Sequence, residues 1–125
     1  MDQGKPCKPW QDSDFRIIPG STRIDYDREK DDLNRREHKY ALESAVVLLE
    51  RIAIPGLRAP PFVVRDAVTS EERRHEHMTI DDSMKVVFFV TTMRHAETIR
   101  VISMRRASAK ERAEFCDITG FREQI

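Results

Sequence analysis

The sequence predicts an α+β fold, with two N-terminal helices and one C-terminal helix packed on an antiparallel meander sheet. Residues 41–51 carry apolar side chains at the spacing of one helix face. Residues 84–92 contain an unbroken apolar run, Val86–Val90, which is typical of a central strand. Four strand-like segments follow one another through short links, and strands joined in this way pair antiparallel. We therefore expect the helices to cover one face of a single sheet.

Size and composition predict one domain without a general affinity for nucleic acid. The chain has 125 residues, and 22 Lys and Arg balance 22 Asp and Glu. A nucleic-acid partner would therefore have to bind a local basic patch. The two cysteines, Cys7 and Cys116, form no metal or redox motif and fit a reducing cytoplasm. No apolar run has the length of a membrane span or the form of a secretion signal, so we expect a cytoplasmic protein without a membrane partner.

The first 20 residues are predicted to be an N-terminal extension, and residues 21–125 to be the folded domain. Prolines and glycines interrupt regular structure here, at Gly4, Pro6, Pro9, Pro19 and Gly20. Four apolar side chains, Trp10, Phe15, Ile17 and Ile18, are suited to docking on the domain or on a partner. A partly disordered tail is the alternative.

A strand and a charged helix are predicted next. Residues 22–26 have strand character, and Asp27 is a good N-cap for a helix that runs to about His38. Three polar residues spaced by four, Lys30, Asn34 and His38, form one stripe on this helix. Such a stripe is either a solvated face or a binding surface.

The second helix carries a stripe that predicts burial, namely Leu42, Ala45, Val46 and Leu49. A strand is then expected over residues 62–66. If residues 73–80 form the next strand, alternation places Arg73, His75 and His77 on one face and Arg74, Glu76 and Met78 on the other. Asp81-Asp82-Ser83 is a turn signal before the apolar strand.

The last strand is predicted to run directly into a helix that covers Ala109 to about Asp117. Ser108 and Glu111 have the spacing of a capping box at the start of this helix. Arg105 and Arg106 end the strand just before that helix N-terminus, a position that suits phosphate binding. Ordinary surface arginines are the alternative, and a strand-end arginine is expected to bury little.

Four segments of the chain resemble the BrnT toxins of bacterial type II toxin–antitoxin modules, which belong to the RelE-like ribonuclease superfamily. The most similar segment is Arg100–Arg112. The other three are Tyr26–Lys30 with Asn34, Glu37–Ala45, and the strand near Glu72–Met78. The resemblance covers about residues 22–116 and keeps the family's element order.

The resemblance implies a RelE-like fold and a metal-independent endoribonuclease without a cofactor. RNA would be cleaved by attack of its 2′-OH on the adjacent phosphorus, and a cognate BrnA-like antitoxin would neutralise the toxin. Contact with DNA would come only through that antitoxin. Glu37, Lys39 and the third strand depart from the family pattern. These departures favour the alternative of a catalytically degenerate module that binds a partner.

Cleavage of this kind needs a base, an acid and cations around the phosphate, which selects arginines and histidines. The predicted catalytic residues are Arg73, Arg74, His75, His77, Arg105 and Arg106. The predicted RNA-binding residues are Lys30, Asn34, His38 and Arg100. His75 and His77 could also share a metal ion if His95 or a carboxylate supplied a third ligand, but we expect no metal.

Overall fold

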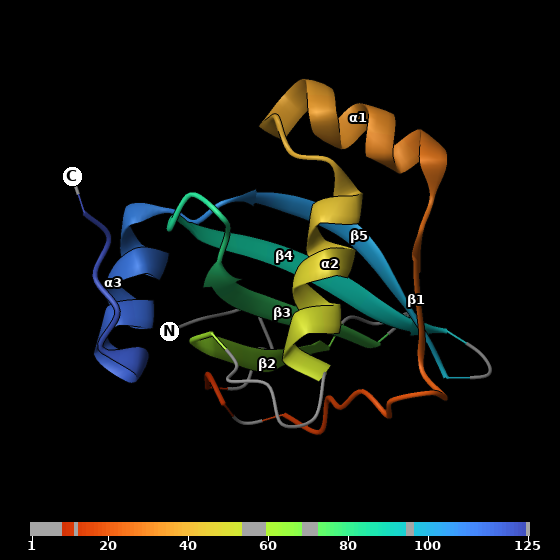
Figure 1. Ribbon diagram of the computed structural model, residues 1–125, viewed down its shortest axis with the longest axis horizontal. Helices are drawn as coiled ribbons and strands as arrows, with labels where there is room; N and C mark the ends of the chain where they lie inside the picture. The colour runs from red at the N-terminus through yellow and green to blue at the C-terminus, as the bar shows by residue number, and fades with distance from the viewer. Residues whose placement is uncertain (1–8, 12, 54–59, 69–72, 95–96, 125) are drawn as a thin grey trace.

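The computed structural model describes residues 9–11, 13–53, 60–68, 73–94 and 97–124. His95 and Cys7 lie outside these residues. The elements follow the predicted order (Figure 1). They are β1 (Arg23–Tyr26), α1 (Arg28–His38), α2 (Leu42–Ala53), β2 (Phe62–Val68), β3 (Arg73–Ile80), β4 (Val86–Arg94), β5 (Thr98–Arg106) and α3 (Ala109–Thr119). No helix within the described ranges has the length and apolar character to cross a membrane.

The α+β fold and its meander are confirmed, but the sheet is mixed. Its strand order is β1-β5-β4-β3-β2, and β2 through β5 pair antiparallel as predicted. β1 joins the edge beside β5 and runs parallel to it, with Ile24 opposite Ile99. No hairpin joins these two strands, since both N-terminal helices and the rest of the meander lie between them. The rule that short links give antiparallel pairs therefore does not apply to β1.

The core on one side of the sheet confirms the predicted helical stripe. Leu42, Ala45 and Leu49 of α2 are fully buried. They pack with Val87, Phe89, Ile99, Val101 and Met104 of the sheet. We call this the α2 side.

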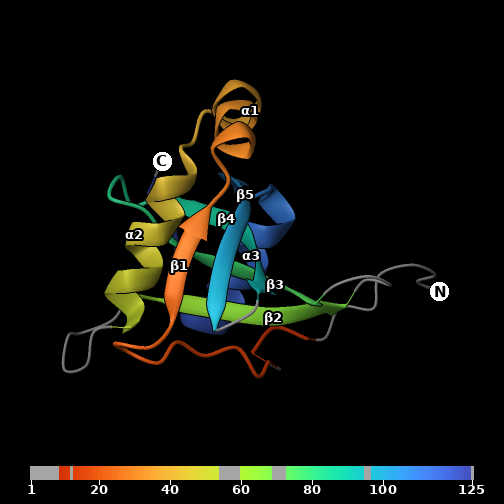
Figure 2. The same ribbon diagram turned by 90° about the vertical axis from the view of Figure 1, so that its right-hand side faces the viewer.

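A second core lies on the opposite side of the sheet, which we call the α3 side. Phe115 of α3 packs there with Val63, Met78, Val86 and Phe88, and Figure 2 shows α2 and α3 on either side of the strands. The expectation that the helices cover one face is therefore wrong. The apolar run of β4 explains the difference, because its alternating side chains put large apolar groups on both faces and each face must be covered.

The described part of the N-terminal segment lies against both cores. Phe15 and Ile17 pack on the α2 side, and Trp10 packs on the α3 side. The backbone N–H of Gln11 donates to the carbonyl of Val64 at 2.8 Å. Docking on the domain, one of the two alternatives, thus describes these residues. The division into an extension of residues 1–20 and a domain of residues 21–125 stays a prediction.

Local capping follows the predicted chemistry. The Asp27 carboxylate accepts from the backbone N–H groups of Glu29 and Lys30 at the start of α1. Ser108 and Glu111 form the capping box of α3, and Gly120 ends that helix with φ +82°. This positive φ suits glycine and turns the last residues of the chain back along α3.

Candidate functional site

The sheet separates the predicted catalytic residues into two groups. Strand pairing aligns His77 with Phe89 on the α2 side, and His75 lies two residues away on the same face. Arg105 aligns with Phe88 on the α3 side. Arg74 and Arg100 also lie on the α3 side, on either side of Thr92. Three predicted arginines thus share one face of the sheet, and both histidines lie on the opposite face.

His77 belongs to the α2-side core. It has no exposed surface, its ring stacks on Phe89 with centroids 4.8 Å apart, and Phe15 meets it edge-on at 4.6 Å. Its Nε2 lies 2.8 Å from Thr91 Oγ1. Burial, together with the neighbouring His75, holds the pKa of His77 well below its ordinary value. A neutral ring without access to solvent cannot exchange protons with RNA, so this placement argues against the predicted catalytic role.

His75 anchors the N-terminal segment. Only 2% of it is exposed, and its Nε2 lies 3.2 Å from Asp66 Oδ1 and 3.4 Å from Asp14 Oδ1. Ser13 Oγ donates to Asp66 at 2.6 Å, and exposed Arg73 donates to Asp14. These contacts place Arg73 and His75 around the chain's own carboxylates, away from Arg105.

Three donor atoms of this anchor have the chemistry of metal ligands. The donor atoms of Asp14, Asp66 and His75 lie within 4.8 Å of one another, and no other described group of His, Cys, Asp and Glu meets that condition. The histidine pair considered above as an alternative, His75 with His77, is not part of this group. The carboxylates already accept hydrogen bonds from Ser13 and Arg73, so the contacts are explained without a metal ion.

The predicted RNA-binding stripe of α1 is divided by burial. Lys30 and His38 are exposed, whereas Asn34 is 4% exposed. The Asn34 amide donates to the carbonyls of Tyr40 and Met104 at 2.8 Å and accepts from the Met104 N–H at 3.0 Å. One donor and the acceptor join α1 to Met104 of β5, and the second donor holds Tyr40 in the link between α1 and α2. Asn34 therefore has a structural role, contrary to the predicted one.

Arg105 is held rigidly at the end of β5. Its guanidinium lies 4.2 Å from the centroid of Phe88, in the geometry of a cation–π contact. Nη1 and Nη2 each donate to a different carboxylate oxygen of Glu111, both at 2.8 Å. Glu111 also accepts from the Ser108 N–H at 2.8 Å, so the capping box of α3 positions the arginine. Among the described residues, Arg105 Nε–H has no hydrogen-bond partner.

Both members of this ion pair are charged at neutral pH. Burial alone raises the pKa of Glu111, but the hydrogen bonds from Arg105 and Ser108 outweigh it and lower that pKa. The hydrogen bond to Glu111 raises the pKa of Arg105. Glu111 is therefore a fixed anion that orients the arginine, and it is poorly suited to carry protons at neutral pH.

Other charged and aromatic side chains share the α3 side with Arg105. Arg65 Nε donates to Glu76 at 2.7 Å and its guanidinium lies 4.1 Å from the Trp10 ring. Arg100 donates to Asp25 at 3.0 and 3.4 Å. Sequence reasoning placed Glu76 on the face of Arg74 but did not select Arg65 or Trp10, because their pairing depends on segments distant in sequence.

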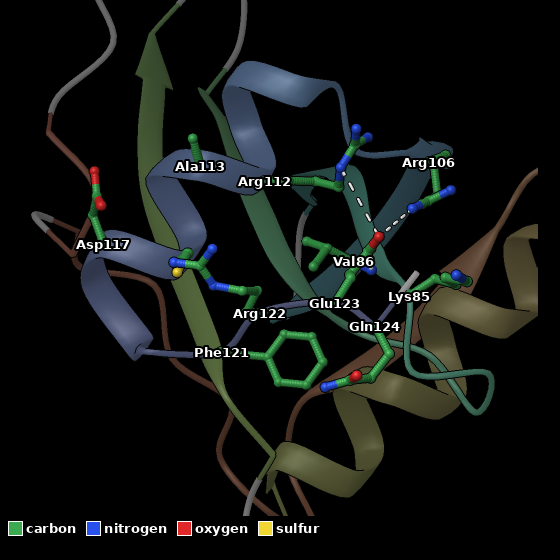
Figure 3. A pocket seen from close by; sticks show the side chains of 11 residues that line it. Lys85, Val86, Arg106, Arg112, Ala113, Asp117, Phe121, Arg122, Glu123 and Gln124 are labelled. Carbon is green, nitrogen blue, oxygen red and sulfur yellow. Dashed lines mark hydrogen bonds and ion pairs between the residues drawn. The ribbon is translucent and has the colours of Figure 1, made fainter.

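Arg106 points into a separate pocket. Strand alternation turns it away from Arg105, into a cavity of about 520 Å³ between the end of β5, α3 and the C-terminal residues (Figure 3). Its Nη2 donates to Glu123, and Arg112 Nε lies 3.9 Å from the same carboxylate oxygen. Sequence reasoning did not select Arg112 or Glu123. Arg112 at least lies in the segment most similar to the BrnT family, whereas Glu123 lies outside the region of resemblance.

Comparison with known proteins gives a family match and a match to a solved structure. Residues 26–111, more than half of the chain, match the family described as "Ribonuclease toxin, BrnT, of type II toxin-antitoxin system". The 1.1 Å crystal structure of the Brucella abortus ribonuclease toxin, BrnT, is 19% identical, with a TM-score of 0.48. That match covers 70% of this chain and 99% of the Brucella chain. No curated protein matches the sequence.

Proposed function

Because the chain belongs to the BrnT family of ribonuclease toxins of type II toxin–antitoxin systems, we propose that it is a metal-independent endoribonuclease. It acts on RNA in the cytoplasm and is neutralised by a cognate, BrnA-like antitoxin. One observation carries the proposal: Arg105, inside the matched region, is preorganised by Phe88 and Glu111 on the same face as Arg74 and Arg100.

The proposed role of Arg105 follows from the charge that develops during cleavage. The bond from O2′ to phosphorus forms while the bond from phosphorus to O5′ breaks, and negative charge accumulates on the phosphoryl oxygens. A cation held in place beforehand stabilises that charge without reorganising. Glu111 accepts hydrogen bonds from Nη1 and Nη2 of the guanidinium. The Nε–H is not used by that carboxylate and is the group that would donate to the phosphate. Arg74 and Arg100 would bind neighbouring parts of the RNA backbone.

A partner-binding module without catalysis is the second candidate. It is favoured by the positions of the described histidines, because His75 and His77 lie on the α2 side and His38 lies on α1. No described histidine lies on the α3 side with Arg105 to serve as acid or base. Lys30 and His38 stay in the proposal as exposed residues that could contact RNA.

RNA cleavage by the purified protein separates the two candidates. We expect wild type to cleave RNA equally with and without EDTA, and Arg105→Ala to lose most of that activity. Arg36→Ala is the matched control, because Arg36 is an exposed arginine on α1 outside the proposed site. A folded wild type that cleaves no RNA and does not arrest growth would support the binding module instead.

Co-expression tests the partner. The chain has no net charge, so binding of an antitoxin has to rely on a local basic patch and apolar contacts. We expect a small protein encoded beside this gene to co-purify with the chain and to restore growth. A protein that stays alone in the presence of every neighbour-encoded product would contradict the toxin–antitoxin assignment.

A further inference from the structure

The pocket beside Arg106 contains a carboxylate in a site built for an anion. Four cationic side chains line it, namely Lys85, Arg106, Arg112 and Arg122. The side chain of Glu123 is 13% exposed and enters from the C-terminal residues, directed at the two arginines of β5 and α3 (Figure 3). Asp117 also lines the pocket, so its lining has four cationic side chains and two carboxylates, an excess of positive charge.

Two hydrogen-bond donors and one further guanidinium surround the Glu123 carboxylate. The Val86 N–H donates to Oε2, Arg106 donates to Oε1, and Arg112 Nε lies 3.9 Å from Oε1. Arg112 is itself fixed, because its Nη1 donates to the Ala107 carbonyl at 2.6 Å. A backbone amide combined with two guanidiniums is the donor set that binds phosphate oxygens in proteins.

The segment that carries Glu123 lies at the edge of the α3-side core, where Phe121 is its partly buried apolar contact. Residues 120–124 form no helix or strand, and Gly120, with φ +82°, reverses their direction after α3. Phe121 holds them by an edge-on contact with Phe115, with centroids 6.1 Å apart. A segment without helical or strand hydrogen bonds opens at lower free energy than the strands beneath it.

We propose that Arg106, Arg112 and the Val86 amide form a subsite for a phosphate group of the RNA, and that Glu123 occupies it in the free protein as a built-in competitor. The inference rests on the proposed function, since it takes RNA to be the ligand. The side chains of Arg105 and Arg106 project from opposite faces of the sheet at the end of β5. They would therefore bind different phosphates of one RNA strand that crosses the end of β5. Burial raises the pKa of Glu123, but the Val86 amide and Arg106 outweigh it and keep the occupant anionic.

Binding of an RNA that cannot be cleaved tests the subsite apart from catalysis. The probe is a fluorescent single-stranded oligonucleotide with 2′-O-methyl groups, measured by anisotropy at several salt concentrations. Glu123→Gln should tighten binding roughly tenfold, the scale of one charge-assisted contact. It should also steepen the plot of log affinity against log salt by about 0.7, the value for one more neutralised phosphate. Glu50→Gln, the same charge change at an exposed position of α2, should produce neither effect.

Two further variants assign the gain to this pocket. Adding Arg106→Gln or Arg112→Gln to Glu123→Gln should remove the gain, while circular dichroism confirms that each variant is folded. Inorganic phosphate alone should shift the NMR signal of the Val86 amide in Glu123→Gln and leave wild type unchanged. Such a shift supports the subsite even if the protein cleaves no RNA, so the two proposals fail separately.

Several outcomes would overturn the inference. They are an unchanged RNA affinity in Glu123→Gln, an equal gain in Glu50→Gln, and a gain that persists without Arg106. A gain in affinity for the antitoxin alone would also overturn it, because the pocket would then be an acidic-peptide site.

Discussion

Replacing Arg105 with Ala removes the side chain on which the proposed chemistry depends. We expect RNA cleavage to fall by roughly a hundredfold or more, the loss seen when one preorganised charge-stabilising donor is removed. Arg105→Lys should recover only part of the rate, because lysine keeps the charge and loses the planar fork that Glu111 holds. The assay is the initial rate of cleavage of a labelled RNA by each purified variant, with growth arrest as the readout in cells.

The structure raises the expected cost of Arg105→Ala to folding. A strand-end arginine was expected to bury little, but this side chain is only 36% exposed and covers Phe88. The cation–π contact is worth about 0.5–1 kcal/mol and the partly exposed ion pair about 0.2–1 kcal/mol. The variant should therefore lose about 1–2 kcal/mol, or about 4–8 °C in Tm, and still be folded at 25 °C. Arg36→Ala should change stability by no more than about 0.5 kcal/mol.

Thermal unfolding separates the two effects of Arg105→Ala. If the variant is folded at the assay temperature and cleaves RNA at the wild-type rate, Arg105 does not stabilise the reacting phosphate. If its Tm equals that of wild type, the contacts with Phe88 and Glu111 contribute no stability and the packing argument is refuted.

Three further predictions concern stability. The folded protein lowers the pKa of Glu111, so this residue stabilises the fold above its ordinary pKa of 4.5, and the stabilisation is lost as the pH falls through the lowered pKa. Glu111→Gln should therefore make Tm depend less steeply on pH in that acid range. An unchanged slope would refute this. The folded protein lowers the pKa of His77, so below pH 6.5 the unfolded chain binds a proton at this residue that the folded chain does not. Wild type should therefore lose free energy of unfolding between pH 7 and 5, and His77→Gln should lose less, as measured by urea titration. An equal loss in both proteins would mean that the ring titrates normally and would refute this. If residues 1–20 are an extension outside the folded domain, as the sequence indicates, deleting them should cost only about 1 kcal/mol. Packing of Phe15 on His77 instead predicts a loss of about 2–4 kcal/mol, which a Tm change of only a few degrees would contradict.

The helices, caps and strand links that depend only on neighbouring residues could be predicted from the sequence. The stripe Leu42, Ala45, Val46 and Leu49 predicted the face of α2 that packs on the sheet, with Val46 only partly buried, because helical periodicity depends only on neighbours in sequence. The caps at Asp27 and Ser108 were readable for the same reason. Short links were sufficient to predict the meander from β2 to β5.

Strand partners, buried faces and ion pairs between residues distant in the chain could be identified only in the folded protein. β1 pairs with β5 across more than half of the sequence, and no local pattern specifies that partner or its direction. Alternation showed that His75 and His77 share a face, but only the packing of α2 and Phe15 made that face the buried one. The pairing of Glu123 with Arg106 required the chain to turn back at Gly120 and fold along α3. A single sequence specifies which groups a strand or helix presents, whereas the free energy of packing distant elements selects what those groups meet.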